Sequence, residues 1–207
     1  MDAILDFGEK GFPGILVETI AIFINNLAAP ANTKVFSLTH RLHLTQPQAY
    51  IFDPELPYWI IYRNQLFDSV CRKLDFDVFE VFRDRQLTNK LLSSSGELRV
   101  LKSRNLSDDG KEILDIPGYD SYISYAAAKP LSVFQYLDTP NVYLTPNMTY
   151  KPRMMKKPPH CVVNGSLAIL IPKGGIVPTE KQLAYFSSEE YRACLLYTSD
   201  AADDSLR

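Results

Sequence analysis

The chain has 207 residues, with 22 Lys+Arg against 24 Asp+Glu and a formal net charge of −2. A total this close to neutral excludes binding to nucleic acid through bulk charge alone, so any basic surface depends on how the charges are distributed. No apolar run approaches the roughly 20 residues that span a bilayer. No basic segment followed by a cleavable apolar core opens the chain, so we expect a cytoplasmic protein without a membrane partner.

The first expected elements are strands at residues 4–7 and 15–24, joined by a turn rich in glycine. The second run is apolar and β-branched apart from Glu18 and Thr19, which is typical of a strand buried on both faces. Residues 34–38 form another expected strand. Asn64 is expected to cap a helix, because the apolar residues after it recur at spacings of three and four: Leu66, Phe67, Val70, Cys71 and Leu74.

Beyond that helix the pattern changes to short strands separated by turn residues. The expected strands are residues 78–82, 98–101, 141–144 and 167–171. Asp109-Gly110, Pro117-Gly118 and Asn164-Gly165 provide turn chemistry between them. We therefore predict an α+β fold that is rich in β-structure from about Tyr58 onward.

Basic residues concentrate in two windows. Residues 83–104 hold six basic residues against Asp84 and Glu97, and residues 139–179 hold no acidic residue at all. The second window contains Lys151, Arg153, Lys156, Lys157 and Lys173, so we expect a positive field that no local carboxylate cancels. Such a surface suits a polyanion, although a solvated basic loop between strands has the same composition.

Three segments carry a resemblance to one family. They are ILDFGEKGFPGILVETIAIFINN (residues 4–26), FEVFRDRQLTNKLLSSSGELRVLKSRNLSDDG (residues 79–110) and NVYLTPNMTYKPRMMKKPPHCVVNGSLAILIPK (residues 141–173). In this order they resemble adenine-specific DNA methyltransferases of restriction-modification systems. The first looks like a late piece of the catalytic domain, and the other two look like the target-recognition region.

This resemblance implies the end of an α/β catalytic domain at residues 1–57, a β-rich target-recognition domain at residues 58–193, and double-stranded DNA as the partner. Members of the family bind S-adenosylmethionine through a glycine-rich loop. They hold the flipped adenine at an Asn/Asp-Pro-Pro-Tyr/Phe motif. Neither feature is present here, since Lys157-Pro158-Pro159-His160 lacks both the amide and the aromatic residue. We expect the intact parent to be the enzyme and to bind the cofactor, and this fragment to bind no cofactor and to be inactive.

The resemblance also implies two groups of DNA contacts. Lys and Arg bind phosphates and fix register, whereas Arg, Asn and Gln read base edges. The expected contacts are Arg83, Arg85, Gln86, Asn89, Lys102, Arg104 and Asn105 in one group, and Asn147, Tyr150, Arg153, Lys156 and Lys157 in the other. No His or Cys has the spacing of a metal site, so no metal is expected.

The segment CLLYTSDAADD resembles the in-frame translation of a sequencing-library adapter, so we treat residues 194–207 as a non-native tail. Without them the net charge is zero. Three other functions remain open. The recognition domain is also compatible with a DNA-specificity subunit or with a restriction enzyme fused to a methyltransferase. A non-catalytic interaction domain with incidental basic loops is the third.

Overall fold

The computed structural model describes residues 1–27, 29–56, 58–147 and 149–198. The chain divides into two compact units. The first holds Met1–Lys73 and the described residues from Ala193 onward, and the second holds Leu74–Arg192. Helices and mixed sheets are both present, which confirms the α+β class at a coarse level. No helix in these ranges is long and apolar enough to cross a membrane.

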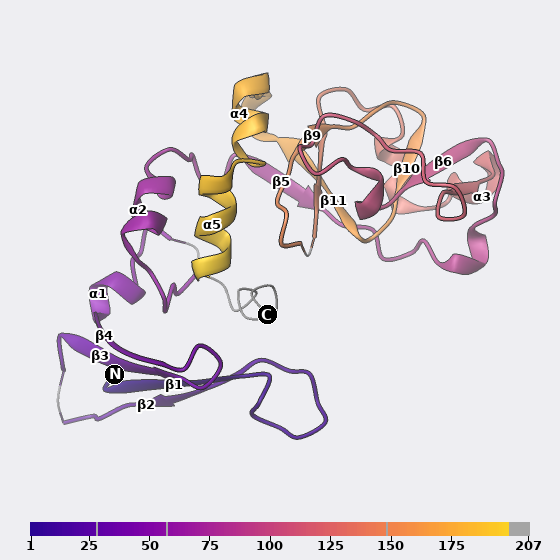
Figure 1. Cartoon of the computed structure of the whole chain (residues 1–207). Coiled ribbons are helices and arrows are strands. Elements are labelled where there is room, and N and C mark those ends of the chain that lie inside the picture. Colours follow the sequence, from indigo (N-terminus) through magenta and orange to yellow (C-terminus); the bar gives the residue numbers. More distant parts are fainter. Residues whose placement is uncertain (28, 57, 148, 199–207) are drawn as a thin grey trace. The chain divides into compact units, whose positions relative to one another are not determined.

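The first unit is built on a four-stranded mixed sheet in the order β2-β1-β3-β4 (Figure 1). Its elements are β1 (Ala3–Gly8), β2 (Thr19–Phe23), β3 (Asn32–Ser37), β4 (Leu42–Pro47), α1 (Gln48–Ile51) and α2 (Gln65–Cys71). β1 lies parallel to β3 and antiparallel to β2. Ile4 of β1 and Val35 of β3 are partners in register, and both are fully buried together with Ile51. One face of the sheet therefore carries the core of this unit.

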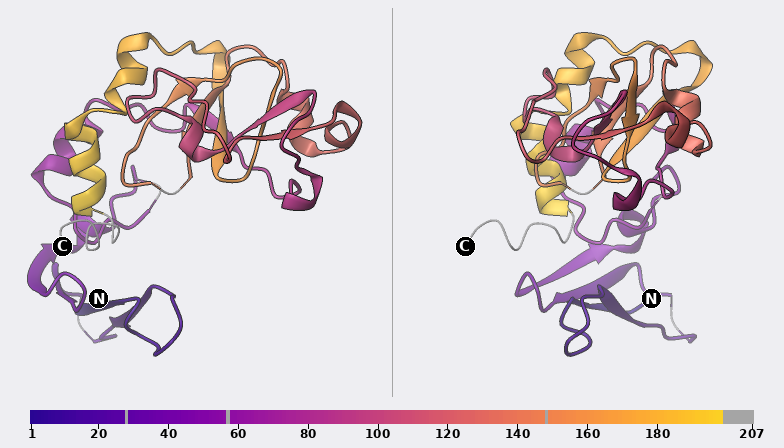
Figure 2. Two further views of the ribbon diagram at one scale, coloured as in Figure 1. Left: turned by 45° about the vertical axis from the view of Figure 1, so that its right-hand side comes forward. Right: turned by 90° about the vertical axis from the view of Figure 1, so that its right-hand side faces the viewer.

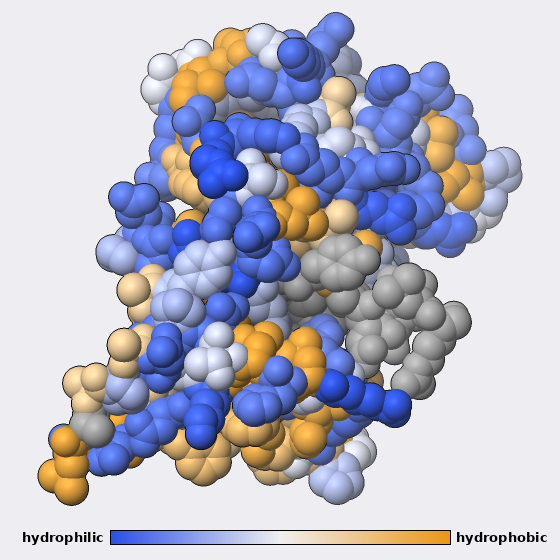
Figure 3. Space-filling view, turned by 60° about the vertical axis from the view of Figure 1, so that its left-hand side comes forward, coloured by the Kyte–Doolittle hydropathy of each residue, from blue (hydrophilic) through white to orange (hydrophobic). Residues whose placement is uncertain are grey.

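The apolar run at residues 15–24 is not a strand buried on both faces, and that prediction was wrong. β2 begins only at Thr19 and lies at the edge of the sheet. Ile20 and Ile22 are 45% and 40% exposed, and Leu16, before the strand, is 83% exposed. Figure 3 shows hydrophobic side chains gathered on this part of the molecule. An apolar composition predicts a buried strand only where a second layer of the chain covers it.

The helix expected after Asn64 is confirmed. α2 begins at Gln65, and the Asn64 side chain accepts a hydrogen bond of 2.9 Å from the backbone N–H of Phe67. Arg63 forms ion pairs of 2.7 Å with Asp53, which precedes α2, and with Asp68, which lies in α2. These contacts keep α2 in the first unit, so the two units separate after Lys73, beyond the predicted domain boundary at residues 57/58.

The second unit contains two small sheets, in the orders β10-β6-β7 and β5-β11-β8-β9. Its strands are β5 (Phe79–Phe82), β6 (Leu98–Leu101), β7 (Ser121–Ile123), β8 (Tyr143–Pro146), β9 (Met155–Lys156), β10 (Cys161–Val163) and β11 (Leu167–Pro172). The helices are α3 (Tyr125–Ala128), α4 (Glu180–Tyr185) and the short 3-10 turns Asn89–Leu91, Ser103–Asn105, Ser132–Tyr136 and Lys173–Gly175. Figure 2 shows that long loops connect these short strands.

Both sheets contribute to one hydrophobic core. Val100 and Leu101 of β6, Leu144 of β8 and Ile169 of β11 are almost completely buried in the same cluster. β11 pairs with β5 on one side and β8 on the other, both antiparallel, whereas β10 runs parallel to β6. Each strand expected from the sequence in this region is present, with bounds that differ by up to two residues.

The last described element, α5 (Glu189–Thr198), runs through the boundary at which the non-native tail was predicted to begin. Cys194, the first residue of that tail, is only 4% exposed. Residues 199–207, which hold most of the adapter-like sequence, lie outside the described residues.

Candidate nucleic-acid interface

The turn between β10 and β11, Asn164 to Ser166, links the two sheets of the second unit. The Asn164 backbone N–H donates to the carbonyl of Leu101, at the end of β6, over 3.0 Å. The Asn164 side-chain oxygen accepts from the backbone N–H and the hydroxyl of Ser166, at 3.0 and 2.6 Å. A turn in which the Asn side chain accepts a hydrogen bond from the residue two positions later is typical of Asn followed by Gly.

The carbonyl of Gly165 joins residues from both predicted contact groups. It accepts from Nε of Arg83 at 3.0 Å and from the side-chain amide of Asn147 at 2.5 Å. A Cβ at Gly165 would lie 2.6 Å from the carbonyl oxygen of Asp84, so the close approach of β5 requires glycine here. Arg83 follows β5 and Asn147 follows β8, and one peptide group thus brings together two chain segments that are distant in sequence.

Ser166 and Arg153 both form hydrogen bonds with Ser103, in the segment after β6. The hydroxyl of Ser166 accepts from the backbone N–H of Ser103 at 2.9 Å. The Arg153 guanidinium donates to the carbonyls of Ser103 and Lys151, at 2.8 and 2.7 Å. The segments that follow β5, β6 and β8 therefore converge on the β10–β11 turn. We call this region the strand-end cluster; it consists of Arg83, Ser103, Asn147, Arg153 and the turn at residues 164–166.

Arg153 is buried and joins two loops of this cluster through hydrogen bonds. Its side chain is 6% exposed, and burial lowers the pKa of its guanidinium while Asp108 opposes the shift. Its Nε has no hydrogen-bond partner among the residues described. A buried guanidinium that bonds to two loop carbonyls positions those loops, and a direct phosphate contact is not open to it in this conformation.

Two cations share one aromatic ring at the edge of the cluster. Nζ of Lys102 lies 3.8 Å from the ring centroid of Tyr119, and Cζ of Arg104 lies 4.6 Å from it. Burial lowers the pKa of the Lys102 ammonium, Asp120 opposes this, and the charge of Arg104 lowers it further. Arg104 has no ion pair with any described carboxylate, so a bound anion would relieve the repulsion between the two cations.

Asp120 is committed to other donors. It accepts from Nη2 of Arg99 at 3.0 Å, from the side-chain amide of Asn105 at 2.6 Å and from the backbone N–H of Ile116 at 3.0 Å. Asn105 is fully buried, and its side-chain oxygen accepts from the Lys102 backbone N–H at 3.0 Å. Asn105 thus fixes the loop that presents Lys102 and Arg104.

The expected positive field over residues 139–179 is reduced in the folded chain by carboxylates from other segments, and this expectation is corrected. Lys151 forms an ion pair with Asp108, and Lys173 forms one of 2.5 Å with Asp77. Lys157 is 6% exposed and donates to the carbonyls of Leu137 and Pro158, at 2.8 and 3.0 Å. The carboxylates come from parts of the chain 43 and 96 residues away, where the local sequence gives no sign of them.

Burial divides the twelve predicted contacts into three sets. The exposed set is Arg83, Arg85, Gln86, Asn89, Arg104, Tyr150 and Lys156; the half-buried set is Lys102 and Asn147; the buried set is Asn105, Arg153 and Lys157. Gln86 accepts from the Ser132 N–H at 2.7 Å through its amide oxygen, which leaves its amide NH₂ available as a donor. Whether any of the twelve touches DNA stays a prediction, and the buried set is placed to support the cluster.

Sequence reasoning missed the residues that assemble the cluster. Tyr119 holds the two cations, and Ser103 and Ser166 join the segments. Gly165 was identified only as a turn residue. Its link to β5 depends on a contact across the sheet that no local pattern contains.

Among the residues that the structure describes, no group of three or more His, Cys, Asp or Glu could hold a metal ion. No protein-family model matches the chain, and no curated protein sequence matches it either. The resemblance to adenine-specific DNA methyltransferases therefore stays a prediction.

Proposed function

We propose that this chain is the C-terminal, DNA-recognising part of a site-specific adenine DNA methyltransferase of a restriction-modification system. In this proposal the target-recognition domain binds double-stranded DNA through the strand-end cluster. The first unit contains the end of the catalytic domain. S-adenosylmethionine and the catalytic motif belong to the intact parent, because the sequence of this chain contains neither the cofactor loop nor the catalytic tetrapeptide.

The convergence of the two predicted contact groups on Gly165 and Ser103 carries the proposal. Arg83 and Asn147 share one carbonyl, and Arg153 links the segment of residues 149–151 to Ser103, next to Arg104. Around these links, Arg83, Arg85 and Arg104 have no ion pair with a described carboxylate. Unneutralised guanidinium groups beside exposed amide side chains combine the two elements of DNA recognition, phosphate binding and base reading.

The first prediction concerns Arg85 and Arg104, which are exposed and make no hydrogen bond within the described chain. Each change to Ala should weaken binding to every duplex sequence and reduce the slope of log K against log salt by about 0.9 for each phosphate that is no longer bound. Fluorescence anisotropy of a labelled mixed-sequence duplex, titrated at several salt concentrations, measures both quantities.

Lys129→Ala provides the control, since Lys129 is exposed after α3 and takes part in none of the contacts of the cluster. We expect it to retain at least half of the parent affinity. Binding that does not depend on salt, or an Arg85→Ala/Arg104→Ala variant with the affinity and slope of the parent, would refute the proposal and favour an interaction domain.

A further inference from the structure

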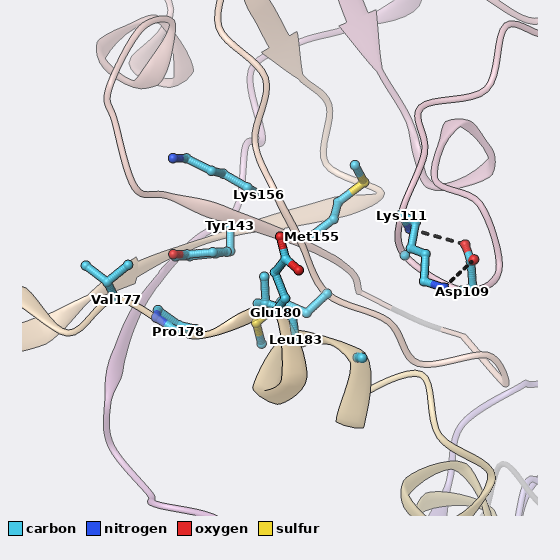
Figure 4. Close-up of a pocket in the computed structure, with 12 residues that line it drawn as sticks. Asp109, Lys111, Tyr143, Met155, Lys156, Val177, Pro178, Glu180 and Leu183 are labelled. Carbon is cyan, nitrogen blue, oxygen red and sulfur yellow. Dashed lines mark hydrogen bonds and ion pairs between the residues drawn. The ribbon is translucent and has the colours of Figure 1, made fainter.

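A cavity of about 560 Å³ lies in the second unit (Figure 4), and Gly110 and Met154 of its lining lie beside Arg153 of the strand-end cluster. Three segments line it: the loop at residues 109–111, the paired strands β8 and β9, and residues 177–184 with the start of α4. Its size falls within the range of about 300–1,000 Å³ that is usual for small-molecule sites. Every lining residue belongs to the second unit.

The buried side chains that line the cavity are apolar, and two of them are flexible methionines. Tyr143, Met154 and Met155 are 2%, 5% and 9% exposed, and Leu183 of α4 packs against the cluster that contains Tyr143 and Met154. Thioether groups adapt their shape and make favourable contacts with aromatic rings. This lining suits a flat aromatic body better than a branched polar one.

Tyr143 adds one polar group to this lining. Its hydroxyl forms no hydrogen bond with any described residue, and its oxygen end points toward Val177 in Figure 4. Burial raises the pKa of this hydroxyl, so it stays protonated and can donate to a ligand.

The Tyr143 hydroxyl and the Lys156 ammonium are both donors that suit a negative group on the ligand. Lys156 has no carboxylate within ion-pair distance in the described chain, whereas Lys111 is already held by Asp109 at 3.6 Å. Glu180 also lines the cavity, and Figure 4 draws its carboxylate beside Met155. Glu180 lies in the first turn of α4, where backbone N–H groups partly offset a negative charge. The unpaired ammonium of Lys156 is therefore the attachment point for an acid.

We propose that this cavity binds an amphipathic aromatic acid. The aromatic body lies on Tyr143, Met154, Met155 and Leu183, and a carboxylate, sulfonate or phosphate group pairs with Lys156. Binding here requires no DNA, although Lys156 is also one of the predicted DNA contacts.

Methionine methyl groups allow a local test on the full chain. The chain has four Met residues, of which Met154 and Met155 line the cavity and Met1 lies in the first unit. With ¹³C-methyl methionine, naphthalene-2-sulfonate should shift the Met154 and Met155 signals saturably through ring currents. The Met1 signal should stay in place. Leu substitutions assign the signals. Apolar binding to the exposed strand of the first unit cannot imitate this result.

A matched cation and three variants complete the test. 2-Naphthylmethylammonium, with the same ring and the opposite charge, should bind about 5-fold more weakly or worse. Lys156→Glu should weaken sulfonate binding by a similar factor, and Ala184→Trp should abolish it by filling the cavity. Lys181→Glu makes the same charge change on α4 outside the lining and should leave affinity unchanged.

Three outcomes would overturn the proposal: Met154 and Met155 signals that do not respond to the sulfonate, tighter binding of the ammonium, or a Lys156→Glu variant with the parent affinity. The methyl spectrum of each free variant shows whether its fold is intact. If the spectrum of Lys156→Glu is collapsed, Lys156→Gln replaces it, and a smaller loss of affinity is expected because Gln removes the positive charge without adding a negative one.

Discussion

At the scale of single residues, Gly165 is where the predicted interface depends most on the absence of a side chain. Gly165→Ala places a methyl group 2.6 Å from the Asp84 carbonyl, so β5 and the turn have to separate. Overpacking of this kind costs roughly 1–3 kcal/mol. We expect a lower urea midpoint by circular dichroism and weaker DNA binding, since Arg83 and Asn147 lose their common acceptor.

Gly174 provides the control for this substitution. It has a φ of +61°, and no atom lies within 4 Å of the position that a Cβ would occupy, so Asn, which tolerates the left-handed region, fits there. Gly174→Asn should stay within about 0.5 kcal/mol of the parent. A Gly165→Ala variant as stable as Gly174→Asn would show that the turn can move without cost.

The residue scale also shows why the candidate site could be predicted only in part. The family resemblance and residue type selected both contact groups, but they could not report that Lys157 is buried or that Asp108 reaches Lys151. One consequence is experimental. Lys157→Ala would leave a buried carbonyl, that of Leu137, and a partly buried one, that of Pro158, without this donor, so weaker DNA binding by that variant would not identify a phosphate contact. Lys156→Ala, at an exposed position, is the more informative change.

At the scale of elements, Asn64 gives a prediction for α2. Asn64→Ala removes the hydrogen bond to the Phe67 N–H, and the loss of such a cap costs about 1 kcal/mol. The single tryptophan, Trp59, lies in the first unit with its ring centroid 4.5 Å from that of Phe52. Trp59 fluorescence during urea unfolding should therefore show a lower midpoint for this variant.

Asn64→Asp tests the cause of that loss. Aspartate accepts the same hydrogen bond and places negative charge at the helix N-terminus. The free energy of unfolding should therefore return to within a few tenths of a kcal/mol of the parent value. Equal destabilisation by Ala and Asp would mean that the cap does not stabilise α2.

Elements were predictable where the local pattern matches the environment of the strand. β6 coincides with its predicted bounds, because a short apolar segment between turn residues is also buried in the fold. The run at residues 15–24 is also mostly apolar, but several of its side chains are exposed, and only residues 19–23 are a strand. Local composition measures what a segment prefers. The surrounding chain decides whether that preference is met.

At the scale of the whole molecule, the α+β class followed from the alternation of patterns, but the division into units did not. Arg63 binds both Asp53 and Asp68, so α2 belongs with the elements before it. Composition at residues 57/58 gives no sign of that link. The assignment of the two units to a catalytic remnant and a recognition domain stays a prediction.

The tail yields the last prediction, because burial separates two parts of the adapter-like segment. From the sequence alone, deletion from residue 194 onward should be neutral, but Cys194 is 4% exposed within α5. Chains ending at residue 198 and at residue 193 therefore differ in expected stability. The first should keep the parent thermal midpoint within about 1 °C. The second loses the buried thiol and the second half of α5, and its midpoint should fall by several degrees. Scanning calorimetry of the three chains measures these midpoints. Equal midpoints would mean that α5 contributes no stability beyond residue 193. A lower midpoint for the chain ending at residue 198 would mean that residues 199–207 stabilise the fold.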